Sequence, residues 1–234
     1  MARRKFTNLL ALAVLSCLSE KPMHPYEISQ TLRTRGKDQS IKLNYGALYS
    51  VVESLAKAGF IEARETVREG RRPERTVYAI TPAGLEECES WLADLVGTPL
   101  REYHSLEAAL SLIAGLRPDV VVRLLGERTV HLRSEIAGVE ESIKVSHEMG
   151  LPDLFLVETE FRLALLRAEH DFVVTLAASI RNETMGGVAT WRAMHVLQDQ
   201  GVGLEEILSD PVKHLGTDGE ILAALTGGPP GADE

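Results

Sequence analysis

The sequence has 234 residues, of which 44% are hydrophobic, so it can form one large domain or two small ones with substantial cores. Its two cysteines exclude the disulfide framework that holds many small secreted domains together. The formal net charge of -9 would argue against nucleic-acid binding if the charge were evenly spread along the chain.

The charge is divided unevenly between two parts of the chain. Residues 1–80 hold 14 lysines and arginines against 8 acids, a net charge of +6. Residues 81–234 hold 11 against 26, a net charge of -15. A basic first part can attract a polyanion, while an acidic remainder restricts it to one face of the molecule.

The chain start admits two interpretations. Arg3, Arg4 and Lys5, followed by the apolar run LLALAVLSCL, imitate a secretory signal, and the four residues ending at Cys17 imitate a lipoprotein cleavage box. The alternative is a buried helix, which we favour because Pro25 opens another helix soon afterwards and leaves no linker after a cleavage site. No other apolar run approaches the ~18 residues that span a bilayer, so we expect a cytoplasmic protein that does not bind a membrane.

Three helices are expected before residue 60. The first runs from a cap at Thr7 or Asn8 to Leu18. The second begins at His24-Pro25, because proline tolerates the first helical position, and ends at Gly36. The third ends at Gly59, and its core-facing stripe comprises Leu48, Val51, Val52 and Leu55.

A β-hairpin is expected next, because the hydrophobic period changes from about 3.6 to 2 after Phe60. Residues 61–66 form a regularly alternating strand, and Arg75 to Ile80 form its partner. The segment Glu69-Gly70-Arg71-Arg72-Pro73 between them supplies turn residues and two adjacent positive charges.

One more helix completes the predicted first domain, residues 1–98. Thr81-Pro82 supplies an N-cap and a proline at the first helical position, and Gly97-Thr98-Pro99 ends the domain. The predicted buried stripe of this helix is Leu85, Cys88, Leu92 and Leu95.

The predicted second domain, residues 99–226, is entirely helical, with a disordered tail at 227–234. Helices are expected over 105–114, 118–149, 153–181 and 188–198, with a weaker segment over 204–225. The helix at 118–149 carries a seam of near-heptad spacing that we expect to mediate dimerisation: Leu125, Leu132, Ile136, Val139 and Ile143. The helix at 153–181 and this helix should form an antiparallel hairpin. The apolar stripe of the helix at 153–181 comprises Phe161, Leu165, Ala168, Phe172 and Leu176.

The predicted fold is therefore mainly α with a small β-hairpin wing. A helix followed by a basic hairpin is typical of a winged helix-turn-helix domain, in which the helix enters the major groove of DNA and the hairpin reaches the backbone phosphates. The alternative for the arginine pair is solvated surface charge, and for Tyr49 a packed ring. The candidate DNA contacts are Tyr26, Lys42, Asn44, Tyr45, Gly46, Tyr49, Ser50, Arg64, Arg71, Arg72 and Arg75.

Enzymatic motifs are missing from the sequence. It has no nucleophile elbow, phosphate loop, HExxH pair or dinucleotide fingerprint, and its seven histidines show no metal-ligand spacing with the cysteines. We therefore expect no enzyme, no metal and no cofactor. Several polar and aromatic residues of the second domain are candidates for an effector pocket, with core or interface residues as the alternative: Tyr103, Arg167, His170, Trp191 and His195.

The first domain resembles the PadR-type transcriptional regulators, a family of bacterial winged-helix repressors. The resemblance covers about residues 8–96 and rests on HPYEISQTL, YGALYSVVESLAKAGFIEAR and GRRPERTVYAITPAGLEECESWL. Tyr26, Tyr49 and Tyr78 match tyrosines of the family pattern, whereas Pro25 and Ser50 stand where the family usually has glycine and proline.

This resemblance implies a homodimer that binds a pseudo-palindromic operator through two recognition helices and represses a nearby promoter. Some members of the family respond to small molecules, and the sequence leaves open whether this chain has an effector. The seam at residues 125–143 independently supports a dimer. The alternative is a winged-helix module for protein–protein interaction that does not bind DNA in a sequence-specific way.

Overall fold

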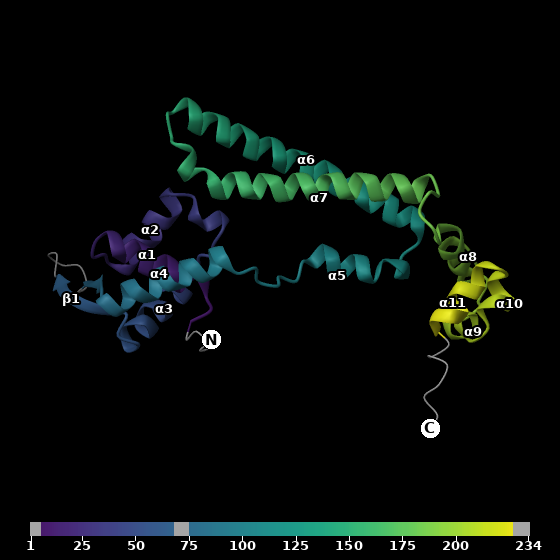
Figure 1. Ribbon diagram of the computed structural model, residues 1–234, viewed down its shortest axis with the longest axis horizontal. Helices are drawn as coiled ribbons and strands as arrows, with labels where there is room; N and C mark the ends of the chain where they lie inside the picture. Colours follow the sequence, from purple (N-terminus) through teal and green to yellow (C-terminus); the bar gives the residue numbers. More distant parts are fainter. Residues whose placement is uncertain (1–5, 68–74, 227–234) are drawn as a thin grey trace, which may run out of the picture. The chain divides into compact units, whose positions relative to one another are not determined.

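The structure, a computed structural model, describes residues 6–67 and 75–226. The chain forms two compact units, Met1–Glu102 and Tyr103–Glu234 (Figure 1). The described part is mainly helical, with one two-stranded antiparallel sheet. In this part of the chain, no helix is both long and apolar enough to cross a membrane.

The first unit is built around one buried helix. Its elements are α1 (Leu9–Glu20), α2 (Pro25–Thr34), η1 (Lys37–Gln39), α3 (Tyr45–Lys57), β1 (Ile61–Val67), β2 (Arg75–Ile80) and α4 (Pro82–Gly97). Helix α1 contacts α2, α3, α4 and β2, and eight of its twelve residues are buried. The apolar run that imitates a secretory signal is thus the centre of the hydrophobic core.

Local capping explains where the helices of this unit begin. The Asn8 side chain accepts a hydrogen bond from the Leu10 amide (3.0 Å), and Thr81 Oγ1 accepts one from the Gly84 amide (3.1 Å). At the start of α2, His24 Nδ1 accepts from the Tyr26 amide, and the His24 amide donates to Glu27. These contacts satisfy amide groups that have no partner within the helix.

The predicted buried stripe of α4 is wrong in two positions. Leu85 and Leu92 are exposed, and the buried side is formed by Gly84, Cys88 and Trp91. Gly84 decides this orientation, because a Cβ built there would lie 2.0 Å from the Phe60 carbonyl oxygen. The first turn of α4 therefore lies directly against the end of the α3–β1 connection, which only glycine permits.

The hairpin differs from the predicted regular alternation at one residue. Ala63 pairs with Tyr78 and Glu65 pairs with Val77, so Arg64 is an extra residue in β1. This β-bulge interrupts the period of two, which sequence periodicity alone does not detect. The hairpin is tied to the helices through Met23, whose backbone exchanges two hydrogen bonds of 3.0 Å with Tyr78.

The second unit contains a long helical hairpin. Its elements are α5 (Ser105–Ser111), η2 (Ile113–Gly115), α6 (Pro118–Glu148), η3 (Asp153–Phe155), α7 (Val157–Arg181), α8 (Val188–Asp199), α9 (Leu204–Ser209), α10 (Pro211–Leu215) and α11 (Asp218–Thr226). Helices α6 and α7 lie side by side and antiparallel along most of their length (Figure 1). The predicted weak segment at 204–225 consists of three short helices.

The packing of α6 against α7 differs from two predictions, the dimerisation seam of α6 and the buried stripe of α7. Leu125, Leu132 and Val139 of the proposed dimerisation seam are buried in this hairpin, and Ile136 and Ile143 on the same face are partly buried. The seam is thus occupied by α7 of the same chain. On α7 the buried residues are Leu163, Val173, Ala177 and Ile180, whereas Phe161, Leu165 and Phe172 of the predicted stripe are exposed.

Both cysteines are buried free thiols. Burial raises the pKa of the Cys17 thiol to about 11 and also raises the pKa of the Cys88 thiol. Each thiol therefore stays protonated near neutral pH, and neither has the character of a reactive cysteine.

The close approach of α4 to Phe60 gives a stability prediction. We expect Gly84→Ala to lower the free energy of unfolding by about 1–3 kcal/mol, because the added methyl group overlaps the Phe60 carbonyl. Gly97→Ala in the same helix is the matched control, since a Cβ there meets nothing within 4 Å. Denaturant unfolding measures both, and equal stability of the two variants would contradict this packing.

Candidate nucleic-acid interface

Helices α2 and α3 form a helix-turn-helix in which each presents one side to the core. Ile28 and Leu32 of α2 are buried, as are Leu48, Val52 and Leu55 of α3. Gly36, in the left-handed conformation with φ of +68°, ends α2, and the short helix η1 leads towards α3. The opposite sides of both helices are exposed and form the candidate interface.

Tyr45 and Arg33 join the two helices on this exposed side. The Arg33 guanidinium carbon lies 4.7 Å from the centroid of the Tyr45 ring, and Nη1 donates a hydrogen bond to the Tyr45 hydroxyl (3.2 Å). A cation–π contact and a hydrogen bond thus both join the Tyr45 side of α3 to α2. Arg33 retains further N–H donors for a phosphate oxygen.

Two more tyrosines lie on the same surface. The relative exposures of Tyr26, Tyr45 and Tyr49 are 42%, 42% and 45%, so none is a core residue. The Tyr26 hydroxyl accepts a hydrogen bond from Gln30, one turn further along α2 (2.8 Å). The Tyr49 ring packs edge-on against His24 at a centroid distance of 6.5 Å. Tyr49 was interpreted from the sequence either as a DNA contact or as a packed ring. In the structure one edge of its ring is packed, and the side chain is still accessible to a ligand.

Asn44 is a helix cap, which changes its predicted role. Its Oδ1 accepts hydrogen bonds from the amides of Gly46 (2.9 Å) and Ala47 (3.4 Å). Asn44 is exposed as predicted, but it precedes α3 and its side-chain oxygen is committed to the first turn of the helix. Gly46 and Ser50 are exposed one turn apart on α3, where small residues let a ligand approach the backbone closely.

The remaining predicted contacts are less constrained. Lys42 is exposed just before α3. Arg64 is the bulged residue of β1 and forms an exposed ion pair with Glu62 (3.6 Å). Arg75 begins β2. Arg71 and Arg72 lie outside the described residues.

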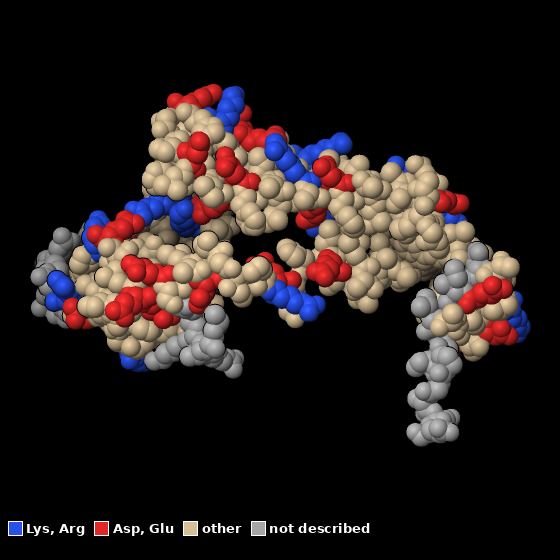
Figure 2. All heavy atoms as spheres, in the orientation of Figure 1, with Lys and Arg blue, Asp and Glu red and all other residues tan. Residues whose placement is uncertain are grey.

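The charge distribution within the first unit also favours the exposed side of α2 and α3 as the nucleic-acid interface. Helix α4 carries four acids and no base, namely Glu86, Glu87, Glu89 and Asp94. Figure 2 shows acidic side chains gathered over this helix. Residues 25–57, which include α2 and α3, hold five bases against three acids. One base is committed elsewhere: Arg35 forms hydrogen bonds with Glu20 that lower the pKa of that carboxyl.

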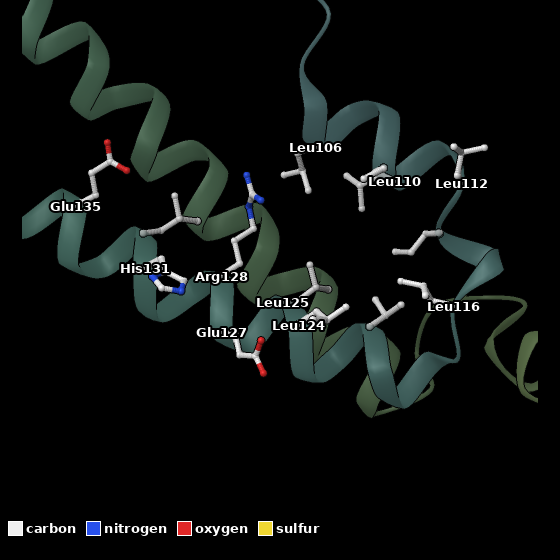
Figure 3. Close-up of a pocket in the computed structure, with 14 residues that line it drawn as sticks. Leu106, Leu110, Leu112, Leu116, Leu124, Leu125, Glu127, Arg128, His131 and Glu135 are labelled. Carbon is white, nitrogen blue, oxygen red and sulfur yellow. The ribbon is translucent and has the colours of Figure 1, made fainter. Parts of the chain in front are cut away.

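A separate apolar cavity lies in the second unit, between α5 with η2 and the first half of α6 (Figure 3). Its volume is about 590 Å³. Aliphatic side chains dominate its wall, with polar groups of α6 at one end: Glu127, Arg128, His131 and Glu135 (Figure 3). The three charged groups already have partners, since Glu127 pairs with Arg123 (2.7 Å), Arg128 with Glu169 (2.6 Å) and Glu135 with Arg162 (3.1 Å).

The predicted effector residues do not form this cavity. Trp191 Nε1 donates to the carbonyls of Ala114 and Leu116, and His195 also contacts the Ala114 carbonyl. Arg167 pairs with Glu140 at 2.6 Å, and Tyr103 is largely exposed near the start of the unit.

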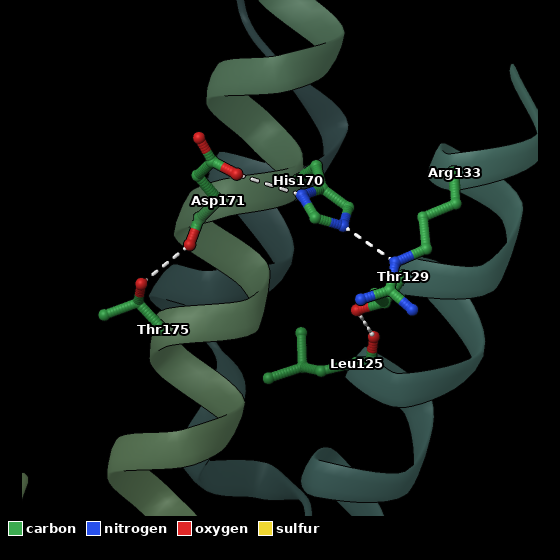
Figure 4. Close-up of polar contacts among 6 residues, drawn as sticks. All are labelled: Leu125, Thr129, Arg133, His170, Asp171 and Thr175. Atoms are coloured by element: carbon green, nitrogen blue, oxygen red, sulfur yellow. Dashed lines mark hydrogen bonds and ion pairs between the residues drawn. The ribbon is translucent and has the colours of Figure 1, made fainter. Parts of the chain in front are cut away.

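His170 joins the two long helices instead (Figure 4). Arg133 Nε donates to His170 Nε2 (3.2 Å), and His170 Nδ1 contacts Asp171 (3.0 Å). Of the five residues proposed for an effector pocket, Trp191 and His195 thus meet at the Ala114 carbonyl, while the other three lie elsewhere. None of the five lines the cavity.

Sequence reasoning missed Arg33 and the cavity. Arg33 follows Tyr26 by two helical turns and thus shares its face, a signal that was present in the sequence. The cavity residues Leu106, Leu110 and Leu124 look like ordinary core leucines in the sequence. Only the three-dimensional arrangement shows that a space remains between their helices.

The three helices, the hairpin and the exposed side of α3 define a winged helix-turn-helix domain. Residues 14–90 match the model of the transcriptional regulator PadR-like family. This domain of the chain is therefore similar to the PadR-like family over residues 14–90. No curated protein matches the chain.

Solved structures extend the fold similarity beyond this domain. Bacillus subtilis PadR in complex with operator DNA is 18% identical with a TM-score of 0.61, over 73% of this chain and 98% of that one. The Vibrio cholerae virulence activator AphA is 16% identical with a TM-score of 0.59, over 74% and 99%. The protein smu.1604c from Streptococcus mutans is 22% identical with a TM-score of 0.52, over 74% and 99%. The covered share exceeds the first unit, so part of the helical unit shares this fold.

The cap at Asn44 gives a prediction that separates folding from recognition. We expect Asn44→Ala to lower the free energy of unfolding by about 1 kcal/mol, because two amides of α3 lose their partner. Asn44→Ser is the matched control, since serine can also cap a helix. Denaturant unfolding of both variants tests this; unchanged stability of Asn44→Ala would mean that the cap contributes nothing.

Proposed function

We propose that the protein is a DNA-binding transcriptional regulator that acts as a homodimeric repressor of a promoter with a pseudo-palindromic operator. The observation that carries this proposal is the exposed Arg33–Tyr45 pair on the helix-turn-helix of a PadR-like domain. The structure of Bacillus subtilis PadR with operator DNA supports the DNA partner by similarity of fold. A cytoplasmic location follows from this role.

In this proposal the first turns of α3 enter the major groove. Gly46 and Ser50 leave room for the groove floor, Tyr45 and Tyr49 contact the edge of the groove, and Arg33 from α2 reaches a phosphate. The proposed wing residues Arg64, Arg71, Arg72 and Arg75 provide sequence-independent affinity. The acids of α4 repel DNA from the opposite side of the domain, so only one orientation is favourable.

The proposed dimer explains how a small domain achieves specificity. One helix-turn-helix reads too few base pairs for a unique site in a genome. Two copies related by a two-fold axis read two half-sites about 34 Å apart, or a multiple of that distance, on one face of the duplex. The second unit, with its excess of acids, would hold the two copies without adding DNA affinity of its own.

We further propose that the cavity between α5 and α6 is an effector site, and that its ligand is a small, uncharged, aliphatic molecule. The wall consists largely of leucines, and the charged groups at its end are already paired. A charged ligand would have to compete with these ion pairs, whereas an uncharged one gains from apolar burial and can form a hydrogen bond with His131.

The wing prediction concerns the salt dependence of DNA binding. Arg71→Ala/Arg72→Ala should weaken binding to the upstream region of its own gene and reduce the slope of log K against log salt by about 2, because about 0.9 counterions are released per phosphate contact. Fluorescence anisotropy over a salt series measures this. Arg123→Ala/Arg181→Ala removes the same charge from the second unit and should leave the slope unchanged.

Two results would contradict this prediction. An unchanged slope in the Arg71/Arg72 variant would reject the wing contacts. Absence of any retarded band at low salt, together with recovery of a protein partner, would favour the protein-interaction module over the DNA-binding regulator.

The cavity prediction can be tested with matched ligands. A saturating medium-chain alcohol should raise the melting temperature of the protein more than the corresponding carboxylate, since only the alcohol avoids the charged rim. Leu124→Glu, on the cavity wall, should remove this shift, while Val130→Glu on the same helix outside the cavity should keep it. A larger shift with the carboxylate would refute the uncharged ligand class.

A further inference from the structure

Helix α8 holds the segment that closes one end of the cavity. This segment, residues 112–116, contains η2 and leads towards α6, and its leucine side chains line the cavity. Figure 3 shows Leu112 and Leu116 at the end of the cavity opposite His131. We call residues 112–116 the end wall, because their position sets the length of the cavity.

The end wall cannot satisfy all of its own carbonyl groups. Within η2 the Gly115 amide donates to the Leu112 carbonyl (3.1 Å), and the backbone becomes extended at Leu116 (φ -108°, ψ 155°). The carbonyls of Ala114 and Leu116 therefore lie beyond the hydrogen bonds of this short helix. Such groups need donors from another part of the chain.

Two side chains of α8 supply these donors. Trp191 Nε1 donates to both carbonyls, at 3.2 Å to Ala114 and at 2.8 Å to Leu116. His195 Nε2, one turn further along α8, lies 3.0 Å from the Ala114 carbonyl and carries the hydrogen of this bond, because a carbonyl only accepts. Trp191 is buried in the core of the unit, so water does not compete for its N–H. Leu116 thus presents its side chain to the cavity and its carbonyl to α8.

The charged contacts of α8 hold a different element. Arg192 Nη1 donates to Asp119 (2.7 Å), and Asp199 pairs with Arg117, the N-cap of α6. Asp119 lies in the first turn of α6, a helix that packs along α7 and is kept in place by that contact. Arg192 therefore ties α8 to α6 and not to the end wall.

We propose that Trp191 and His195 are positioning residues that set the longest ligand the cavity accepts. The inference deepens the proposed effector site and rests on it. A ligand whose hydroxyl bonds with His131 points its aliphatic chain at the end wall. Because α8 fixes this wall through its backbone, a chain that is too long meets Leu116. Apolar burial then raises affinity with each added methylene only up to a fixed length.

A series of straight-chain alcohols tests this length limit on the full-length protein. In the wild type the dissociation constant, measured from the dose dependence of the melting temperature, should fall about fourfold per methylene and then stop falling at one chain length. Trp191→Phe keeps an aromatic ring in the core but removes the indole N–H, so the limit should move to longer alcohols. The longest alcohol that the wild type accepts should bind this variant about 10-fold more weakly, because the wall is no longer preorganised.

Arg192→Gln is the matched control for this experiment. It removes a contact of the same helix, but that contact holds α6, so the variant should keep the wild-type length limit. Hydrogen exchange without ligand gives a second measurement. The Gly115 and Leu116 amides should exchange faster in Trp191→Phe than in Arg192→Gln, and circular dichroism verifies that each variant is folded.

His195 provides a test by rescue. His195→Ala removes one donor to the Ala114 carbonyl and should move the length limit in the same direction as Trp191→Phe. His195→Gln keeps an N–H on a side chain of similar reach and should restore the wild-type limit. A general loss of stability would weaken the binding of every alcohol without moving the limit.

The outcomes separate this inference from the proposed effector site. A limit that moves in Trp191→Phe and stays in Arg192→Gln supports the positioning role. If the wild type shows a limit and Trp191→Phe keeps it, the positioning role is wrong while the cavity still stands as the effector site. A wild type that binds none of the alcohols overturns both the effector site and this inference.

Discussion

The burial of α1 is the constraint on which the first unit depends. Its apolar residues leave almost no polar side, so α2, α3, α4 and β2 must surround it. Each surrounding helix then turns its own apolar stripe inward, Ile28 and Leu32 on α2 and Leu48 with its neighbours on α3. The tyrosines and Arg33 are exposed as a consequence. The orientation of the candidate interface thus follows from the hydrophobic core before any property of DNA is considered.

Local signals made most of this unit predictable. Asn8, Pro25 and Thr81 act within a turn of their own position, so the sequence specifies where their helices start. The errors occurred where distant segments meet. Gly84 turns α4 because the Phe60 carbonyl occupies the space of a side chain, and Arg64 is bulged because of the register with β2. Neither contact leaves a periodic signal, since both depend on an approach between residues far apart in the sequence.

The second unit shows a different limit of sequence analysis. Both apolar faces of α7 have helical spacing, so periodicity cannot decide which one meets α6. The ion pairs decide it: Arg162 and Glu169 bind Glu135 and Arg128 of α6 along one edge of the buried face, and Arg167 binds Glu140 along the other. Charges that flank an apolar seam select its partner and register, as they do in coiled coils. Without the arrangement of α6, these residues look like ordinary surface charges.

The same ion pairs bear on how a ligand in the cavity could influence DNA binding. A ligand shifts a conformational equilibrium only if it binds one arrangement more tightly than the other, so some wall of its site must move. The α6 wall is fixed to α7 by Arg128, and η2 is anchored by hydrogen bonds from Trp191. Helix α5 lacks such polar ties among the described contacts of the unit and meets the core through apolar side chains such as Leu106. It is the wall most free to adjust, and it follows directly on the boundary at Glu102, where the unit that contains the winged helix-turn-helix ends.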